Sequence, residues 1–294
     1  MKSVPFSYLR PQTLDEACEA LGSDPDARVL AGGQTLMPML AMRLARPSLL
    51  IDVTHLDELL GIVDTSDAIL VRSATRQAEA LRSETIRAEV PLLAKALVHV
   101  GHPPTRARGT VGGSVAHGDP SAEISLAATI LGASIHYREG EQTEVFAPED
   151  FFLGPTVTAA PAEGVLTHLA FPKRPDGPVG AGFQEIASRR SDYAFASAGA
   201  QVALDEDGRC RTALLGVGSV GDMPIAVDVS ALDGGELNDA EIGDAVAAAL
   251  EDLDCVDDLH ATASYRRRAA IRLATSALIE ARDAARADAE DGRR

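Results

Sequence analysis

The sequence predicts an α+β protein that is divided into two domains. Short apolar runs typical of strands alternate with stretches of helical periodicity along most of the chain. Near the middle, the segment FPKRPDGPVGAGF at residues 171–183 concentrates proline and glycine, as linkers do. The length of 294 residues, 46% of them hydrophobic, is sufficient for two domains of moderate size. We therefore expect domains at residues 1–176 and 177–288 and a tail at residues 289–294.

The first domain is expected to begin with alternating strands and helices. A strand at residues 5–9 precedes a helix that Thr13 caps, that Glu16 strengthens by reaching back, and that ends near Gly22. The next elements, in chain order, are a strand at residues 28–31, a helix at residues 36–44, strands at residues 49–53 and 69–72, and a helical region at residues 83–100.

Prolines and glycines interrupt the chain after this helical region. The sequence His102-Pro103-Pro104 prevents the helix from continuing, and GTVGGS at residues 109–114 predicts a glycine loop whose backbone can adopt positive φ or approach a ligand closely. Asp119 is expected to cap the following helix, with Pro120 in its first turn. That helix ends near Gly132.

The second domain is expected to combine strands with two amphipathic helices. The expected elements are a strand at residues 164–170 that still belongs to the first domain, strands at residues 193–204 and 211–217, and helices at residues 239–253 and 264–287.

Composition excludes several classes of partner. The chain has 27 basic and 44 acidic residues, and the field of its net charge of −17 repels nucleic acid and anionic lipid. The first ten residues lack the apolar run of a secretory signal, and no stretch approaches the roughly 20 apolar residues of a membrane span. We therefore expect a soluble, cytoplasmic protein without nucleic-acid or membrane partners.

The cysteines exclude a metal redox centre on this chain. Cys18, Cys210 and Cys255 stand far apart and form no CxxC motif, so neither a disulfide framework nor an iron–sulfur cluster fits. His117 is a metal ligand by residue type, but no second ligand stands at a useful spacing. Any metal redox centre must then belong to a partner.

Two glycine segments carry the chemistry. In Ala31-Gly32-Gly33-Gln34-Thr35, two glycines at a strand end allow successive backbone N–H groups to converge on an anion such as a diphosphate. The segment from Thr110 to Ser114 offers the same chemistry, with two hydroxyls as further donors. A single Gly-Gly turn is more often only a turn, but two together indicate an extended dinucleotide. We expect the amides around both glycine pairs to face each other across the same anionic linkage.

A third glycine motif supports an alternative. GVGSVG at residues 216–221 matches the G-x-G-x-x-G pattern of a Rossmann dinucleotide site, which would indicate an NAD-dependent dehydrogenase. A Rossmann loop must open a helix, however, and here Asp222-Met223-Pro224 and the β-favouring IAVDV follow. We therefore interpret the motif as a glycine-rich turn of the second domain and keep the dehydrogenase as the alternative.

Several segments together resemble the FAD-binding, or medium, subunits of the molybdenum hydroxylase family, of the carbon monoxide dehydrogenase and xanthine dehydrogenase type. They cover nearly the whole chain and are FxYxxPxTLDEA at residues 6–17, AGGQT at 31–35, TVGGSVAHGDPSAE at 110–123, SRRSDYA at 188–194 and YRRRAA at 265–270. The resemblance implies an FAD-binding domain of the vanillyl-alcohol-oxidase (PCMH) type, split into two subdomains. A small C-terminal α+β domain with an antiparallel sheet is expected to follow.

The resemblance also implies which residues surround the cofactor. It places the two glycine segments at the FAD diphosphate, with His117 and Asp119 close by, and Leu166 and Tyr193 near the isoalloxazine. The full set of expected cofactor-binding residues is Leu30, Ala31, Gly32, Gly33, Gln34, Thr35, Thr110, Val111, Gly112, Gly113, Ser114, His117, Asp119, Glu123, Leu166 and Tyr193. None of these is expected to be catalytic or to bind metal.

Four residues need separate interpretation. Glu123 replaces an aspartate usual in relatives, and its carboxylate can accept hydrogen bonds from FAD hydroxyls. Gln34 replaces a common histidine, which a cradle built from backbone donors should tolerate. Arg189 and Arg190 have two interpretations of about equal weight: cations that stabilise the reduced flavin, or residues that tie a loop to nearby carboxylates.

The function implied by the resemblance is electron transfer within a larger oxidoreductase. One non-covalent FAD on this chain would take electrons from the two-iron clusters of a small subunit, which receives them from a large molybdopterin subunit, and pass them to an external acceptor. The expected assembly is a dimer of heterotrimers. A scaffold subunit without cofactor is the remaining alternative.

Overall fold

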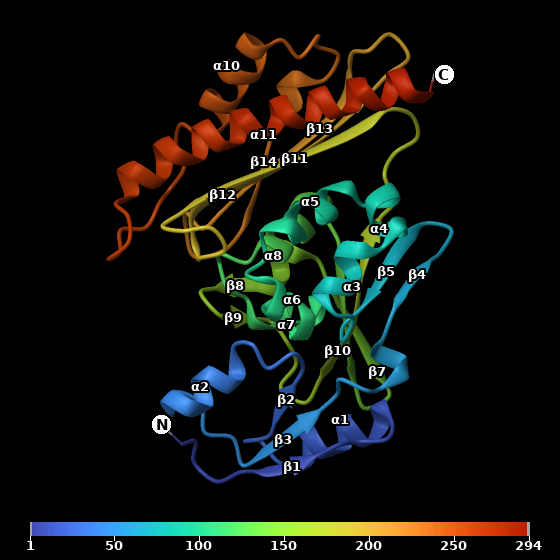
Figure 1. Ribbon diagram of the computed structural model, residues 1–294, viewed down its shortest axis with the longest axis vertical. Coiled ribbons are helices and arrows are strands. Elements are labelled where there is room, and N and C mark those ends of the chain that lie inside the picture. Colours follow the sequence, from blue (N-terminus) through green and yellow to red (C-terminus); the bar gives the residue numbers. More distant parts are fainter. Residues whose placement is uncertain (1, 293–294) are drawn as a thin grey trace.

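The computed structural model describes residues 2–292, which form three regions stacked along the long axis of the molecule (Figure 1). Each region has its own sheet and its own cluster of buried apolar side chains. We call them the N-terminal subdomain, the middle subdomain and the C-terminal domain. The prediction of an α+β fold, with a first domain split into two subdomains and an antiparallel sheet in the C-terminal domain, is confirmed.

A small parallel sheet builds the N-terminal subdomain. Its strands lie in the order β1 (Ser7–Leu9), β3 (Leu49–Asp52), β2 (Arg28–Leu30), and the subdomain also contains α1 (Leu14–Ser23), α2 (Leu36–Met42) and the 3-10 helix η1 (Asp57–Leu59). Thr13 caps α1 by accepting a hydrogen bond from the Glu16 N–H at 3.2 Å, as the sequence predicts. Glu16 reaches back one residue further than expected, since its carboxylate accepts from the Gln12 N–H.

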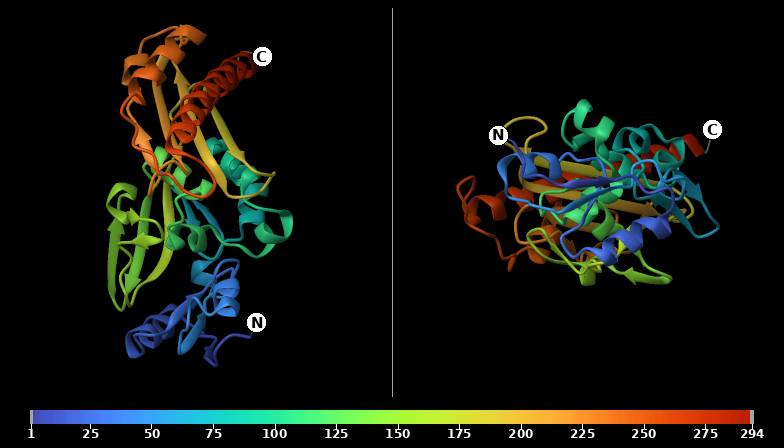
Figure 2. Two further views of the ribbon diagram at one scale, coloured as in Figure 1. Left: turned by 90° about the vertical axis from the view of Figure 1, so that its left-hand side faces the viewer. Right: turned by 90° about the horizontal axis from the view of Figure 1, so that it is seen from below.

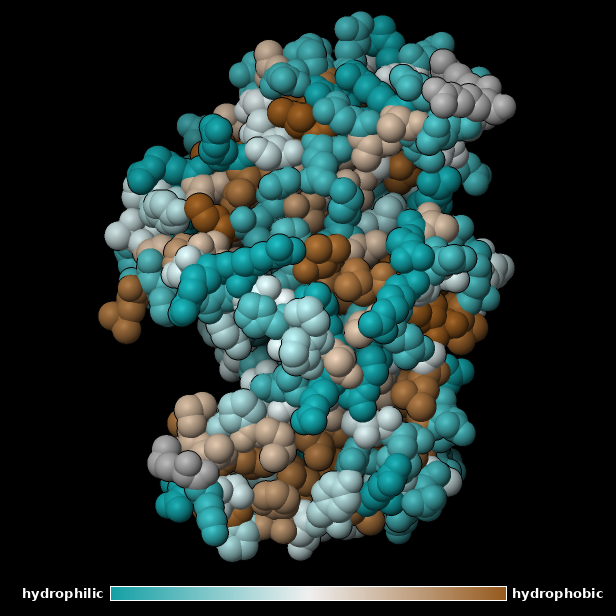
Figure 3. All heavy atoms as spheres, in the orientation of Figure 1, coloured by the Kyte–Doolittle hydropathy of each residue, from teal (hydrophilic) through white to brown (hydrophobic). Residues whose placement is uncertain are grey.

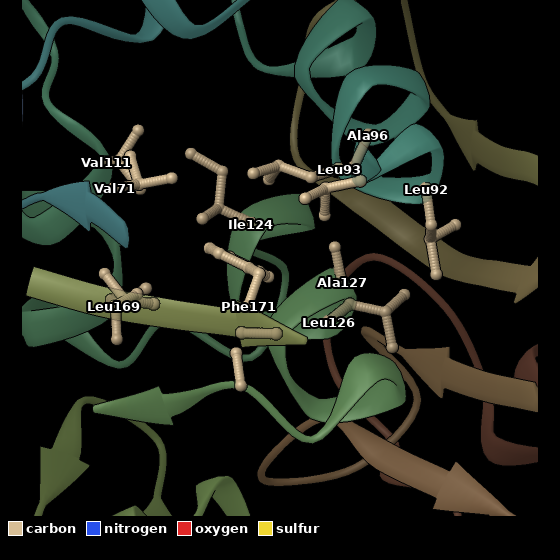
Figure 4. Close-up of a cluster of buried hydrophobic side chains, with 14 of the residues drawn as sticks. Val71, Leu92, Leu93, Ala96, Val111, Ile124, Leu126, Ala127, Leu169 and Phe171 are labelled. Atoms are coloured by element: carbon tan, nitrogen blue, oxygen red, sulfur yellow. The ribbon is translucent and has the colours of Figure 1, made fainter. Parts of the chain in front are cut away.

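The middle subdomain packs helices on one five-stranded antiparallel sheet. The strands lie in the order β4 (Ile62–Asp64), β5 (Ala68–Arg72), β10 (Val165–Pro172), β6 (Ser134–Glu139), β7 (Gln142–Phe146). The helices are α3 (Gln77–Arg82), α4 (Glu84–Glu89), α5 (Pro91–His99), α6 (Pro103–Arg108), α7 (Val111–His117), α8 (Glu123–Leu131) and α9 (Pro148–Phe151), with a hairpin of β8 (Phe152–Gly154) and β9 (Val157–Thr158). Side chains from α5, α7, α8, β5 and β10 meet in its core (Figure 4).

Two predictions about the glycine-rich region are wrong. The segment 109–114 is not an open loop, because α7 begins at Val111 and Thr110 is its N-cap. Asp119 does not cap a helix; its carboxylate accepts from the Ser121 N–H at 2.8 Å in a turn, and α8 begins only at Glu123. Pro103 opens α6 at the point where the helical region was expected only to stop, because proline is well tolerated at the first position of a helix.

The C-terminal domain has an antiparallel sheet covered on one face by a long helix (Figures 1 and 2). Its strands are β11 (Val179–Ala187), β12 (Ala194–Leu204), β13 (Cys210–Gly218) and β14 (Ile225–Val227), and its helices are η2 (Ser230–Leu232), α10 (Asp239–Ala249) and α11 (Ala263–Gly292). The expected tail therefore continues α11 as far as Gly292, and residues 293–294 lie outside the described residues. Within residues 2–292, no helix combines the length and apolarity that crossing a membrane requires.

Half of the glycine-rich segment 171–183 is not a linker. β10 ends at Pro172 and β11 begins at Val179, so only residues 173–178 connect the two sheets. Gly180 and Gly182 lie within β11, where a Cβ atom would overlap the backbone of α11 at Ala281 and Ala277. These glycines let the helix backbone approach the sheet closely.

Candidate cofactor site

The two glycine segments are in direct contact, although about eighty residues separate them. A Cβ atom at Gly32 would lie 2.5 Å from the Arg108 carbonyl oxygen and 2.6 Å from Gly109 Cα. One at Gly113 would lie 3.3 Å from Ala31 Cβ. The turn between β2 and α2 therefore lies against the start of α7, as the sequence predicts. Figure 3 shows the surface hollowed between the N-terminal subdomain and the rest of the molecule, on the side of α2.

The first glycine turn presents unused hydrogen-bond donors. Within the described part of the chain, the backbone N–H groups of Gly32, Gly33, Gln34 and Thr35 donate to no acceptor. Gly33 has φ of +70°, so the chain turns back on itself and the successive N–H groups can point to one side. The Gln34 side chain closes the turn by donating from Nε2 to the Gly32 carbonyl at 3.0 Å. Such a cradle fits the doubly charged linkage of a dinucleotide.

The second glycine segment uses its donors within the protein. The Gly112 N–H donates to the Ser73 carbonyl at 2.9 Å, the Gly113 N–H to Thr110 Oγ1 at 3.0 Å, and the Val111 N–H to the Thr75 carbonyl at 3.0 Å. The expectation that both glycine pairs present free amides is therefore wrong for the second pair. Its amides lie in the first turn of a capped helix, where the cap and the adjacent segment 73–75 satisfy them.

Small size is what this second pair contributes. A Cβ atom at Gly112 would lie 2.5 Å from Ser73 Cβ, so only glycine lets α7 approach Ser73, the residue after β5, this closely. Gly113, Ser114 and His117 follow one another at helical spacing and are partly exposed, whereas Val111 and Thr110 are buried. The open face of α7 therefore consists of Gly113, Ser114, His117 and the exposed Ala116, with Gly113 beside Ala31.

Glu123 brings an unusual carboxyl group to the site. Burial raises its pKa to about 8. Its own backbone N–H opposes this rise, the carboxylates of Glu185 and Asp119 add to it, and Arg106 opposes it. At neutral pH this carboxyl group therefore holds a proton, and it can donate a hydrogen bond to a ligand as well as accept one.

Tyr193 and Leu166 differ in how they can reach a ligand. Tyr193 lies in the turn between β11 and β12, and 68% of it is exposed. Partial burial raises the pKa of Tyr193, and the nearby carboxylates of Asp119 and Glu123 raise it further. These three predicted residues therefore lie in one neighbourhood. Leu166 is 6% exposed and belongs to the middle core, so it offers little surface. Leu30 lies beneath the first turn, close to Gly33.

A pocket of about 570 Å³ lies at the junction of the middle subdomain and the C-terminal domain. Tyr193, Phe195 and Arg266 line it from the C-terminal domain, and Pro120 and Ser121 line it from the middle subdomain. Tyr193 and the two residues that follow Asp119 thus line the same pocket. Across residues 2–292, His, Cys, Asp and Glu side chains form no group of three or more that could hold a metal ion.

Two residues that support the site were not singled out from the sequence. Gln77 is buried and donates from its side chain to the Thr110 carbonyl at 3.3 Å, while its N–H donates to the Gly109 carbonyl. Arg266 is 4% exposed and donates to the Phe195 carbonyl at 2.6 Å, the Ser219 carbonyl at 2.5 Å and Asp258 at 2.6 Å. The sequence signal for such residues is a polar side chain on the apolar face of a helix. It does not identify the hydrogen-bond partners, because these are distant in sequence.

The Rossmann alternative is wrong. Gly216 and Gly218 lie within β13, and β14 follows at Ile225, so no helix starts at this motif. A Cβ atom at Gly216 would overlap the Ile130 side chain of α8, which explains a glycine there by packing.

In the loop of the β11–β12 hairpin, Arg189 Nε lies 3.5 Å from Asp192 Oδ2, and the arginine side chain is 87% exposed. This contact agrees with the loop-tying interpretation of Arg189.

Comparison with known proteins identifies the family. Residues 4–174 match the family described as the FAD binding domain in molybdopterin dehydrogenase. The chain belongs to this family. Residues 181–281 match the CO dehydrogenase flavoprotein C-terminal domain.

Similar proteins match this chain over nearly its whole length. The nicotine 6-hydroxylase medium subunit of Paenarthrobacter nicotinovorans is 33% identical over 96% of this chain and 99% of its own. The carbon monoxide dehydrogenase medium chain of Afipia carboxidovorans is 30% identical over 90% of this chain and 92% of its own. The crystal structure of quinoline 2-oxidoreductase from Pseudomonas putida 86 superposes with a TM-score of 0.91, at 32% identity over 98% of this chain and all of the matched chain.

These comparisons confirm the central predictions from the sequence. The chain is an FAD-binding subunit of the molybdenum hydroxylase type and a flavoprotein oxidoreductase subunit. FAD as its cofactor is confirmed, and molybdopterin and iron–sulfur clusters on partner subunits fit the same architecture. The open amides of the first turn and its close packing on α7 suit the FAD diphosphate, so the residues present fit the cofactor.

Proposed function

We propose that this subunit binds FAD non-covalently, with the diphosphate on the amides of Gly32–Thr35 and against the open face of α7. The contact between the two glycine segments carries this proposal. Where the N-terminal and middle subdomains meet, the first segment keeps four N–H donors that no protein acceptor uses. The isoalloxazine would lie toward Tyr193 and Glu123, which share one neighbourhood.

The proposed cofactor-binding residues divide by role. Amide donors come from the first turn, and Ser114 and His117 contribute polar side chains from α7. Thr110, Val111, Gly112 and Leu30 shape the site from behind, and Thr110 also caps α7. Glu123, Asp119, Leu166 and Tyr193 remain proposed contacts at the far end. No residue of this chain is assigned a catalytic role, because the chain's task is to hold, orient and tune the flavin.

The proposed reaction is electron transfer between partners. A bound flavin accepts electrons singly and releases two together, which suits a position between one-electron and two-electron partners. We propose that the electrons come from iron–sulfur clusters of a small subunit and ultimately from a large molybdopterin subunit, in a dimer of heterotrimers. Relatives named for nicotine, caffeine and carbon monoxide are 33%, 32% and 30% identical, so we propose that the partner subunits, not this chain, determine the substrate.

Two further predictions from the sequence stay proposals. We place the domain boundary between residues 176 and 177, within the connection from β10 to β11. A cytoplasmic location is supported by three cysteines that are all free, two of them buried.

The test uses the complex purified with its partner subunits. We expect flavin and iron–sulfur absorbance, and we expect acid precipitation of the protein to leave FAD in the supernatant in a ratio of about one per copy of this chain. Flavin that stays with the precipitate would contradict the non-covalent proposal. A colourless complex with correct assembly would instead support the scaffold alternative.

A further inference from the structure

Helix α2 lies at the edge of the molecule (Figure 1), and apolar side chains in and after it are exposed. Met37 and Met42 are 48% and 51% exposed, and Leu44, which follows the C-cap residue Arg43, is 70% exposed. Leu40 is the single buried residue of α2. Three of the five methionines of the chain stand in this helix, at positions 37, 39 and 42. Methionine side chains are flexible and polarizable, and they adapt well to the surface of a partner.

The same surface is basic in a chain that is otherwise strongly acidic. Residues 27–51 contain no aspartate or glutamate, although the chain has 44 acidic residues and a net charge of −17. Arg43, Arg46 and Lys2 are exposed around the end of α2, and Arg43 Nε donates to the Lys2 carbonyl at 3.2 Å, which joins the N-terminal segment to the helix end. We call Met37, Met42, Leu44, Lys2, Arg43 and Arg46 the α2 face.

Charge decides between possible occupants of the α2 face. A second copy docked through the same face would bring Arg43 and Arg46 of both copies together, and like charges in a contact are unfavourable. An anionic lipid surface would need an amphipathic helix that lies in the plane of the membrane, and α2 has only seven residues for this. An apolar protein surface bordered by carboxylates matches both properties of the face.

We infer that the α2 face is the docking surface for a partner subunit of the complex, whose contact region is apolar and bordered by aspartate or glutamate. This inference rests on the proposed function, because that function supplies the partner subunits. Since α2 begins directly after the Gly32–Thr35 turn, a subunit seated there also lies beside the proposed diphosphate site.

The experiment measures binding of the isolated, FAD-loaded chain to the remaining subunits of its complex. Met42→Glu and Leu44→Glu place a carboxylate on the α2 face, and we expect each to weaken binding by about 30-fold or more. Arg46→Glu should weaken it several-fold, with a larger effect at low salt. Met42→Leu keeps an apolar side chain and should bind like wild type. Val145→Glu, at a valine that is 56% exposed on β7, is the matched control for an added surface carboxylate and should also leave binding unchanged.

FAD content and thermal unfolding of every variant are measured beside binding, so that a folding defect is recognised. Unchanged binding of Met42→Glu and Leu44→Glu would overturn the inference. So would a dimer of the isolated chain that these variants dissociate while the complex still forms, or binding to anionic vesicles that they abolish while the complex still forms. If the wild-type chain bound no FAD, the proposed function would be wrong. The binding measurement would still show whether the α2 face docks a partner subunit.

Discussion

The segments at Gly32-Gly33 and Gly112-Gly113 share the same dipeptide but serve different purposes in the structure. Gly32 and Gly33 lie in a turn whose N–H groups are unused, whereas the N–H groups of Gly112 and Gly113 are bonded to Ser73 and Thr110. The first pair therefore offers donors to a ligand, and the second allows close packing. A Gly-Gly motif thus indicates a place where backbone must come close to something. Whether that is a ligand or the protein itself depends on the neighbouring segments.

The strongest test of this comparison is Gly32→Ala. Its methyl group would lie 2.5 Å from the Arg108 carbonyl oxygen, so the turn must move away from α7. We expect FAD affinity to fall about 100-fold, which corresponds to about 2.7 kcal/mol, measured by titration of the apo-subunit with FAD. Gln34→Ala in the same turn removes the side-chain hydrogen bond to the Gly32 carbonyl but keeps every backbone donor, so its loss of affinity should be much smaller. Equal losses in both variants would contradict the assignment of the donors to the backbone.

Gly112→Ala tests the packing role of the second pair. The added methyl group would lie 2.5 Å from Ser73 Cβ and 2.6 Å from Ser73 Cα, so α7 must shift away from Ser73, the residue after β5. We expect the free energy of unfolding of the apo-subunit to fall by about 2 kcal/mol. Denaturant unfolding measures this loss. If apo-stability were unchanged and only FAD binding fell, the second pair would be a ligand site like the first.

Glu123 gives the site a dependence on pH. Its folded-state pKa, about 8, lies above the ordinary glutamate value of 4.5, so the folded chain holds a proton that the unfolded chain releases. The associated stability is fully present below about pH 4.5 and is lost as pH rises toward 8. Between pH 6 and 7, unfolding free energy should fall by up to about 1.4 kcal/mol. Glu123→Gln should abolish this slope in the apo-subunit, and a slope that persists in the variant would assign it to other groups.

Thr110→Val is expected to have the smallest effect. The substitution keeps the β-branched shape but removes the hydroxyl oxygen that accepts from the Gly113 N–H. Loss of this N-cap should cost about 1 kcal/mol of stability. The substitution leaves the donors of the first turn in place and also frees the Gly113 N–H. FAD affinity should therefore fall much less than in Gly32→Ala. A larger loss of FAD affinity than of stability would indicate that the Thr110 hydroxyl contacts the cofactor.

Local elements of the fold followed from neighbouring residues. Thr13 caps α1, and Gly132 ends α8 with φ of +61°, because a cap or a left-handed residue depends only on a few adjacent positions. Asp119 shows the limit of such arguments. Its side chain is of a capping type and Pro120 follows it, which is typical of a helix start. In the structure its carboxylate instead accepts from the Ser121 N–H in a turn, and α8 begins four residues later.

The sequence alone determined the family, the cofactor and most strands and helices, because these depend on motifs and on short periodic patterns. Tertiary structure alone decided which glycine amides are free, which glycines of the segment 171–183 serve packing, and that Gln77 and Arg266 support the site. Each of these depends on a partner tens of residues away or more, such as Ser73 for Gly112 and Ala281 for Gly180. Hydrogen bonds and steric overlaps at such separations exist only once the chain has folded.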